Sequence, residues 1–193
     1  FTHMKKLISV LLVLMLLGSL CGMSAAYFPD TVTHWARTEI LAMADAGVIR
    51  GYTDGTFRPD NSITRAEFVT LIVRRYNPTG SGSYSWPMDV AMTSWYYDSF
   101  RQAYTAGLIP AEMLSDSRFH ADRAITREQA AAILNLTLNL PAATGPVYYA
   151  DLSSIAVYAQ DAVANVTAAG IFGGYEDGTF RPSTSLSRAE VAA

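Results

Sequence analysis

Three arginines occupy equivalent places in this sequence, each directly after a Ser or Thr that can begin a helix. Arg65, Arg127 and Arg188 lie in Thr-Arg-Ala-Glu, Thr-Arg-Glu-Gln and Ser-Arg-Ala-Glu, and they are 62 and 61 residues apart. A cation at a helix N-terminus is unfavourable by roughly 0.3–1 kcal/mol, because the helix dipole is positive there. One interpretation is that each guanidinium, with the free N–H groups of the first helical turn, binds an anion. It predicts that removing Arg65 or Arg188 weakens binding and leaves melting nearly unchanged.

The alternative interpretation is that each arginine pairs with a carboxylate of its own chain. The candidates are Asp30, Asp89 and Asp151, one ahead of each arginine. These aspartates can also complement the positive N-terminus of a following helix, or accept hydrogen bonds from the hydroxyl groups of a carbohydrate. The residue types alone leave these interpretations open.

Two tryptophans, Trp35 and Trp95, stand where an amphipathic helix is expected to begin. We therefore expect their rings in the core. The alternative is that an aromatic ring at a helix end stacks on a sugar ring while its other face packs inward. His34 and His120 have no partner at a metal-ligand spacing, so we expect both on the solvated surface.

A unit that the chain repeats three times positions these residues. Residues 51–67 and 174–190 are identical at 12 of 17 positions, and a fainter middle copy lies between them. Stretches rich in Gly, Pro and Ser separate the copies. We therefore expect repeats at 27–77, 87–138 and 148–193, with the third copy truncated at its C-terminal end.

Each copy is expected to form a helix, a loop and a second helix, so the predicted fold class is mainly α. Apolar residues recur at helical spacing in the first segment of each copy. A glycine then ends that helix, at Gly47, Gly107 and Gly170. The second helix begins at a Ser/Thr-x-x-Glu/Gln capping box. The Asp-Gly pairs between the helices favour tight turns, because the further oxygen ligands of a calcium loop are missing.

The composition excludes several classes of function. The chain has 193 residues, and 14 Lys and Arg against 17 Asp and Glu give a net charge of −3. A mildly acidic protein lacks the basic surface that sequence-independent nucleic-acid binding needs, so we expect no nucleic-acid partner. One cysteine and three histidines leave little material for a disulfide framework or a metal centre. No catalytic motif is present, so we expect no enzyme activity, no metal and no cofactor.

Residues 1–26 have the pattern of a secretory signal, with residues 1–3 as read-through ahead of Met4. Two lysines precede an apolar run, and Ser24-Ala25-Ala26 supplies small residues for cleavage. The run is shorter than the roughly 20 apolar residues that span a bilayer. We therefore expect a secreted protein with no membrane segment after cleavage. A permanent membrane helix and a lipoprotein signal at Cys21 are the weaker alternatives.

Several segments together resemble the S-layer homology domain family. They are Phe28-Pro29-Asp30, Trp35-Ala36, Ala46-Gly47-Val48-Ile49, Gly51-Tyr52-Thr53-Asp54-Gly55-Thr56-Phe57-Arg58-Pro59 and Ile63-Thr64-Arg65-Ala66-Glu67. The resemblance covers essentially all of the chain after residue 26, as three tandem copies. It implies mostly helical repeats in a pseudo-threefold arrangement with short β-turn or hairpin loops. It also implies non-covalent binding of secondary cell-wall polysaccharide in grooves between neighbouring repeats.

The resemblance further implies roles for individual residues. The family's ligand is often a wall glycan with a pyruvate ketal, whose carboxylate meets the basic residue of the Thr-Arg-Ala-Glu motif. Here that role falls on Arg65, Arg127 and Arg188. The expected ligand-binding set also includes the family's glycine and aspartate positions and the two tryptophans: Gly51, Gly174, Asp30, Asp89, Asp151, Trp35 and Trp95. The middle copy lacks the loop glycines, so a groove built on its loop is expected to be weak or altered.

We therefore expect a secreted, non-catalytic module that anchors a protein to the cell wall or S-layer by binding pyruvylated polysaccharide. Several grooves on one chain would prolong binding through effective concentration. One alternative is a protein–protein assembly module that packs against S-layer neighbours. The other is the anchor part of a larger secreted enzyme.

Overall fold

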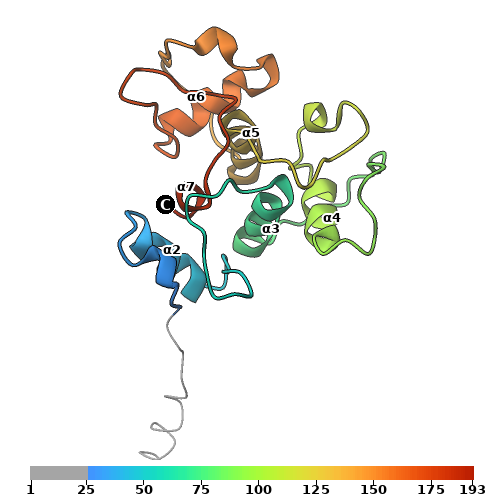
Figure 1. Ribbon diagram of the computed structural model, residues 1–193. Helices are drawn as coiled ribbons and strands as arrows, with labels where there is room; N and C mark the ends of the chain where they lie inside the picture. The colour runs from blue at the N-terminus through green and yellow to red at the C-terminus, as the bar shows by residue number, and fades with distance from the viewer. Residues whose placement is uncertain (1–25) are drawn as a thin grey trace, which may run out of the picture.

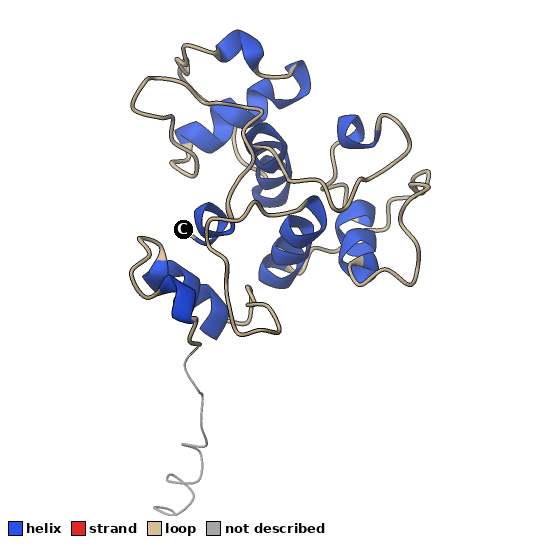
Figure 2. Cartoon of the chain, in the orientation of Figure 1, coloured by secondary structure: helices blue, strands red, loops and turns tan. Residues whose placement is uncertain are grey.

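The computed structural model describes residues 26–193, so the predicted secretory segment lies outside the described residues except for Ala26. In this part of the chain, short helices joined by long loops form three units around a common centre (Figure 1). Figure 2 shows that the units consist of helices and loops. No helix among these residues is long and apolar enough to cross a membrane.

Each copy contributes one outer and one inner helix (Figure 1). The outer helices are α2 (Arg37–Asp45), α4 (Tyr97–Thr105) and α6 (Gln160–Ala168). The inner helices are α3 (Arg65–Tyr76), α5 (Arg127–Leu138) and α7 (Arg188–Ala192). Short 3-10 helices lie in the connecting segments, at η1 (Pro29–Thr31), η2 (Ala111–Leu114), η3 (Leu152–Ser154) and η4 (Val157–Ala159). The predicted mainly α fold class is confirmed.

The helices begin and end at the residues that the sequence marks for those roles. The Thr64 hydroxyl accepts a hydrogen bond from the Glu67 N–H, and the Glu67 carboxylate accepts one from the Thr64 N–H. The same capping box begins α5 and α7. After the outer helices, Gly47, Gly107 and Gly170 have φ angles of 72°, 74° and 70°. Glycine adopts this left-handed conformation without a Cβ clash, so it ends the helix at little cost in free energy.

The three copies meet at a ring of backbone hydrogen bonds. The Ile63 N–H donates to the carbonyl of Leu186 at 3.0 Å, Ile125 to Ile63 at 3.0 Å, and Leu186 to Ile125 at 3.1 Å. All three side chains are buried. Each copy thus donates to one neighbour and accepts from the other. The arrangement is pseudo-threefold, as the family resemblance implies.

Each inner helix packs against the outer helix of the next copy: α3 against α4, α5 against α6, and α7 against α2. The last contact joins the third copy to the first and closes the ring (Figure 1). Phe57, Phe119 and Phe180 hold equivalent positions in the loops between outer and inner helices, and all three are fully buried. Burial of such a ring stabilises the fold by roughly 1.5–3 kcal/mol, which fixes each loop against its helices.

The expectation that Trp35 and Trp95 lie in the core is wrong. The two tryptophans are 66% and 65% exposed, whereas Ala36 and Tyr96, which follow them, are buried. The apolar stripe of each outer helix begins one residue after the tryptophan. The indole ring therefore stays at the surface.

Candidate functional site

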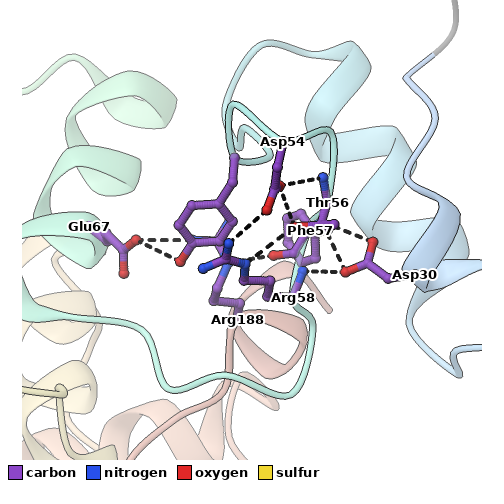
Figure 3. Close-up of polar contacts among 8 residues, drawn as sticks. Asp30, Asp54, Thr56, Phe57, Arg58, Glu67 and Arg188 are labelled. Carbon is purple, nitrogen blue, oxygen red and sulfur yellow. Dashed lines mark hydrogen bonds and ion pairs between the residues drawn. The ribbon is translucent and has the colours of Figure 1, made fainter.

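Arg188 is the predicted anion-binding residue of the third copy, and its side chain is almost completely buried. Its Nε donates to the carbonyl oxygen of Phe57 at 2.9 Å, and its Nη2 donates to the carbonyl oxygen of Arg50 at 2.8 Å. Its Nη1 lies 3.3 Å from Oε1 of Glu67 (Figure 3). The guanidinium carbon also lies 4.8 Å from the centre of the Tyr52 ring. Arg188 therefore holds the loop of the first copy in place.

Arg127 and Arg65 make corresponding contacts around the ring. Arg127 donates from Nε to the carbonyl of Phe180 and from Nη2 to the carbonyl of Gly173, both at 2.8 Å. Arg65 donates from Nη1 to the carbonyl of Phe119 at 2.9 Å. The Nε of Arg65 is buried and has no hydrogen-bond partner within residues 26–193. Each arginine thus binds the backbone of another copy and is itself buried.

The N–H groups of the first helical turns, which the motif alone presents as free, are occupied. In α3 the Arg65 N–H donates to the carbonyl of Arg123 at 2.9 Å, and the Ala66 N–H donates to that of Ala121 at 3.0 Å. In α5 and α7 the acceptors are the carbonyls of Thr184, Pro182, Asn61 and Pro59. An anion at these helix starts would have to displace backbone carbonyls of another copy.

The alternative pairing of the arginines with aspartates is also not what the structure shows. Asp30 accepts hydrogen bonds from the N–H groups of Phe57 at 2.9 Å and Arg58 at 2.6 Å. Asp89 and Asp151 accept the equivalent pairs of N–H groups in their own copies. Burial raises the pKa of the Asp30 carboxyl, but these hydrogen bonds outweigh it and hold the pKa below its usual value. The three aspartates therefore fix the loops.

A second carboxylate shapes the tip of each loop. Asp177 accepts hydrogen bonds from the N–H and the hydroxyl of Thr179, and its Oδ2 lies 2.8 Å from Nη2 of Arg181. The hydrogen bonds from Thr179 and Arg181 lower the pKa of Asp177 to about 2. Asp54 makes the same set of contacts in the first copy (Figure 3). Both carboxylates are thus charged throughout the physiological range.

The middle copy keeps this loop shape without the glycines. Ser117 has a φ of 61° at the position of Gly55 and Gly178. His120 replaces the arginine, and its Nε2 lies 2.6 Å from Oδ2 of Asp116. His120 was expected on the solvated surface, and the structure places it half-buried beside Asp116. The middle loop therefore has the same backbone geometry as the other two loops. Its His120–Asp116 pair takes the place of their Arg–Asp pairs.

The two predicted loop glycines are required by close packing. A Cβ on Gly51 would overlap the ring of Phe28 and lie 2.8 Å from the carbonyl oxygen of Thr56. A Cβ on Gly174 would lie 2.5 Å from Cε1 of Tyr149. Neither position tolerates a side chain while the neighbouring ring stays in place.

A cavity of about 590 Å³ lies beside Arg188, and we name it groove 1. Its charged and aromatic lining comprises Arg50, Tyr52, Glu67, Arg74, Trp95 and Arg188. Gly51 also lines groove 1, so three of the predicted site residues, Arg188, Gly51 and Trp95, meet there. They come from the third, first and second copies respectively. The cavity therefore exists only when all three copies are assembled.

Two arginines of groove 1 were not among the predicted site residues. Arg50 and Arg74 are exposed, and neither forms an ion pair or a side-chain hydrogen bond within the part of the chain that the structure describes. Burial and the neighbouring charge of Arg50 lower the pKa of Arg74. The second copy has Pro110 and Leu136 at the corresponding positions. This difference between the first and second copies was the signal in the sequence that could have identified Arg50 and Arg74 as site residues.

The interface beside Arg65 differs from groove 1 in its electrostatic character. Tyr158, which corresponds to Trp95, is half-buried there. Burial, followed by the charge of Glu128, raises the pKa of Tyr158 to about 12. Glu112 acts in the same direction. Glu128 and Glu112 therefore oppose the charge of Arg65 beside Tyr158, whereas three arginines outweigh Glu67 in groove 1. Residues 26–193 contain no group of three or more His, Cys, Asp or Glu that could hold a metal ion.

Comparison with known proteins finds the S-layer homology domain at residues 27–69 and 148–192. Similar proteins include the Amylopullulanase of Thermoanaerobacterium thermosulfurigenes, which is 33% identical over 174 residues, 86% of this chain and 9% of that protein. The Surface-layer 125 kDa protein of Lysinibacillus sphaericus is 28% identical over 174 residues, 88% of this chain and 14% of that protein. The Cellulosome-anchoring protein of Acetivibrio thermocellus is 30% identical over 155 residues, 77% of this chain and 34% of that protein. The chain thus spans at most about a third of the length of each of these relatives.

Proposed function

This chain belongs to the S-layer homology domain family, and we propose that it is a non-catalytic module that anchors protein to the bacterial cell surface. In this proposal the anchor binds secondary cell-wall polysaccharide non-covalently in groove 1. The observation that carries the proposal is the meeting of Arg188, Gly51 and Trp95, one from each copy, in a single cavity.

The range of relatives supports an anchoring role. They bear names as different as Amylopullulanase, Surface-layer 125 kDa protein and Cellulosome-anchoring protein. In each of them only a small part of the protein matches this chain. A shared part in proteins of such different names is most simply a module that locates them.

The chemistry of groove 1 supports an acidic carbohydrate as the ligand. Trp95 is exposed and offers an aromatic face on which a sugar ring can stack. Arg50, Arg74 and Arg188 outweigh Glu67, which makes the groove positive in a chain whose net charge is −3. A glycan with a pyruvate ketal combines a sugar ring with a carboxylate, and we propose it as the ligand.

The remaining predicted residues have a supporting role in this proposal. Arg65 and Arg127 hold the loops of the second and third copies, as Arg188 holds that of the first. Asp30 fixes the loop that lines groove 1. Rigid loops keep the groove preorganised, which lowers the entropic cost of binding a polysaccharide.

The test is binding of the full chain to purified wall polysaccharide from a Gram-positive bacterium, before and after chemical removal of pyruvate. We expect the parent chain to bind the native polysaccharide and to lose binding when pyruvate is removed. Trp95→Ala should weaken binding about tenfold, since it removes the stacking face. Trp35→Ala is the matched control, because Trp35 is equally exposed and does not line groove 1.

Two results would contradict the proposal. Equal binding to native and pyruvate-free polysaccharide would rule out the ketal as the recognised group. Binding to an S-layer protein without any binding to the polysaccharide would favour the protein–protein assembly module instead.

A further inference from the structure

We propose that, in groove 1, the carboxylate of the ligand is bound by the side chains of Arg50 and Arg74, and that Arg188 is a positioning residue for Arg50. This inference rests on the proposed function of groove 1. It assigns binding of the ligand carboxylate to two residues outside the repeated motif. The motif arginine, Arg188, positions one of them and does not bind the carboxylate itself.

The first reason is that Arg188 has little left to offer an anion. Its side chain is 6% exposed. A guanidinium has five N–H donors, and in Arg188 three of them already serve the carbonyls of Phe57 and Arg50 and the carboxylate of Glu67. A ligand carboxylate would have to enter a space in which Glu67 already supplies the negative charge. Electrostatic repulsion between the two carboxylates opposes that position.

The second reason is that Arg50 and Arg74 are two exposed cations that form no ion pair within residues 26–193. Arg50 follows the end of α2 and Arg74 lies in the last turn of α3, and both line the same cavity. Burial, followed by repulsion from Arg50, lowers the pKa of Arg74. A carboxylate between them would relieve this repulsion and form charge-assisted hydrogen bonds with both.

The third reason is that Arg188 is tied to the backbone that carries Arg50. Its Nη2 donates to the Arg50 carbonyl at 2.8 Å, and its Nε donates to the Phe57 carbonyl at 2.9 Å. These bonds fix both ends of the segment 50–57. Arg188 therefore sets where the Arg50 side chain begins, which preorganises the anion site.

The same argument singles out groove 1 among the interfaces between copies. The second copy has Pro110 in place of Arg50 and Leu136 in place of Arg74. The second copy consequently carries neither cation, and the third copy has Gly173 in place of Arg50. The buried motif arginines recur in all three copies, whereas the Arg50–Arg74 pair does not. Tight binding of an acidic ligand should therefore be confined to groove 1.

The test measures affinity of the full chain for pyruvylated wall polysaccharide by calorimetry, for the parent, Arg50→Gln, Arg74→Gln and the double variant. Each single change should weaken binding about tenfold, as expected for the loss of a charge-assisted contact. Arg75→Gln is the matched control, because Arg75 is the next residue of α3, is also exposed, and lines a different cavity. None of these exposed changes should alter the melting temperature. On polysaccharide stripped of pyruvate, the parent and all variants should show the same loss of binding.

The outcomes separate the inference from the proposed function. If the parent binds native and pyruvate-free polysaccharide equally, the proposed function fails, whatever the variants do. If the parent requires pyruvate while Arg50→Gln and Arg74→Gln bind as tightly as the parent, only this inference is overturned.

A double-mutant cycle tests the positioning role of Arg188. Arg188→Lys should lower both affinity and the melting temperature, and its effect on affinity should largely disappear in the Arg50→Gln background. If Arg188→Lys instead reduces affinity by the same factor with and without Arg50, at an unchanged melting temperature, then Arg188 contacts the anion directly.

Discussion

The Nε of Arg188 donates a hydrogen bond of 2.9 Å to the carbonyl oxygen of Phe57, which lies 131 residues earlier in the chain. This bond joins the last copy to the first. Arg127 reaches Phe180 and Arg65 reaches Phe119 in the corresponding way. The motif arginines therefore close the ring of copies, and their hydrogen bonds to backbone carbonyls offset the unfavourable charge at the helix start. This structural role changes what a substitution there should do.

Replacing Arg127 should destabilise the fold. Arg127→Ala leaves the carbonyls of Phe180 and Gly173 without their donors, and the buried acceptor at Phe180, left unsatisfied, costs about 1–3 kcal/mol. We expect the free energy of unfolding, measured in urea, to fall by roughly 2–4 kcal/mol. This reverses the sequence-based expectation that removal of a motif arginine leaves melting nearly unchanged.

The control for this substitution is Arg181→Ala. Arg181 forms an exposed pair with Asp177, so its removal should cost less than about 1 kcal/mol. If the two variants unfold at the same urea concentration, the contacts of Arg127 do not stabilise the assembled ring.

Neighbouring glycines should respond differently to the same change. Gly174→Ala places a Cβ 2.5 Å from the Tyr149 ring and 3.0 Å from the carbonyl oxygen of Thr179. Such overpacking should reduce the free energy of unfolding by about 1–3 kcal/mol. A Cβ on Gly173 meets nothing within 4 Å, so Gly173→Ala should be nearly neutral. Thermal denaturation of the two variants makes the comparison, and equal melting temperatures would refute the packing explanation.

The aspartate ahead of each outer helix should be needed for loop stability. Asp151→Ala removes the acceptor of the Phe180 and Arg181 N–H groups, which are hydrogen-bonded at 2.8 and 2.7 Å. We expect a loss of about 1–3 kcal/mol in urea unfolding, and faster amide hydrogen exchange at those two N–H groups. Glu176→Gln, an exposed change in the same loop, serves as control. Unchanged exchange at Phe180 and Arg181 would show that the loop keeps its shape without the carboxylate.

The exposed loop carboxylate should titrate at unusually low pH. The pKa of Asp177 is about 2 in the folded chain, against an ordinary value of 3.8. Because the folded pKa is depressed, the stabilising contribution of Asp177 is present above about pH 4 and is lost as the pH falls towards 2. NMR of the Asp177 carboxyl carbon should give a midpoint near 2. Arg181→Gln should raise that midpoint, and an unchanged value in the variant would remove Arg181 as a cause.

Much of the fold could be predicted because its signals are local. The capping box at Thr64 and Glu67 and the helix-ending glycine at Gly47 depend on residues within one helical turn, and both formed as expected. The repetition of these signals at a spacing of about 60 residues also indicated equivalent units. The middle loop was harder to predict, because Ser117 adopts the conformation expected of glycine.

The site was less predictable, because its contacts join residues that are far apart in the chain. The types of Arg188 and Trp95 and their places in the repeat follow from the sequence. The packing of one copy against the next decides the rest. It buries the guanidinium of Arg188 on the carbonyls of Phe57 and Arg50, and it leaves the indole of Trp95 exposed.

The sequence by itself determined that this protein consists of three related units of capped helices, since caps, stops and apolar stripes act over a few residues. Only the tertiary structure decided that Arg188 binds internal carbonyls and that Arg50 and Arg74 line one cavity with Trp95. The physical reason is that a hydrogen bond or an ion pair depends on distances of a few ångströms. Between residues of different copies, those distances are set by the closure of the ring.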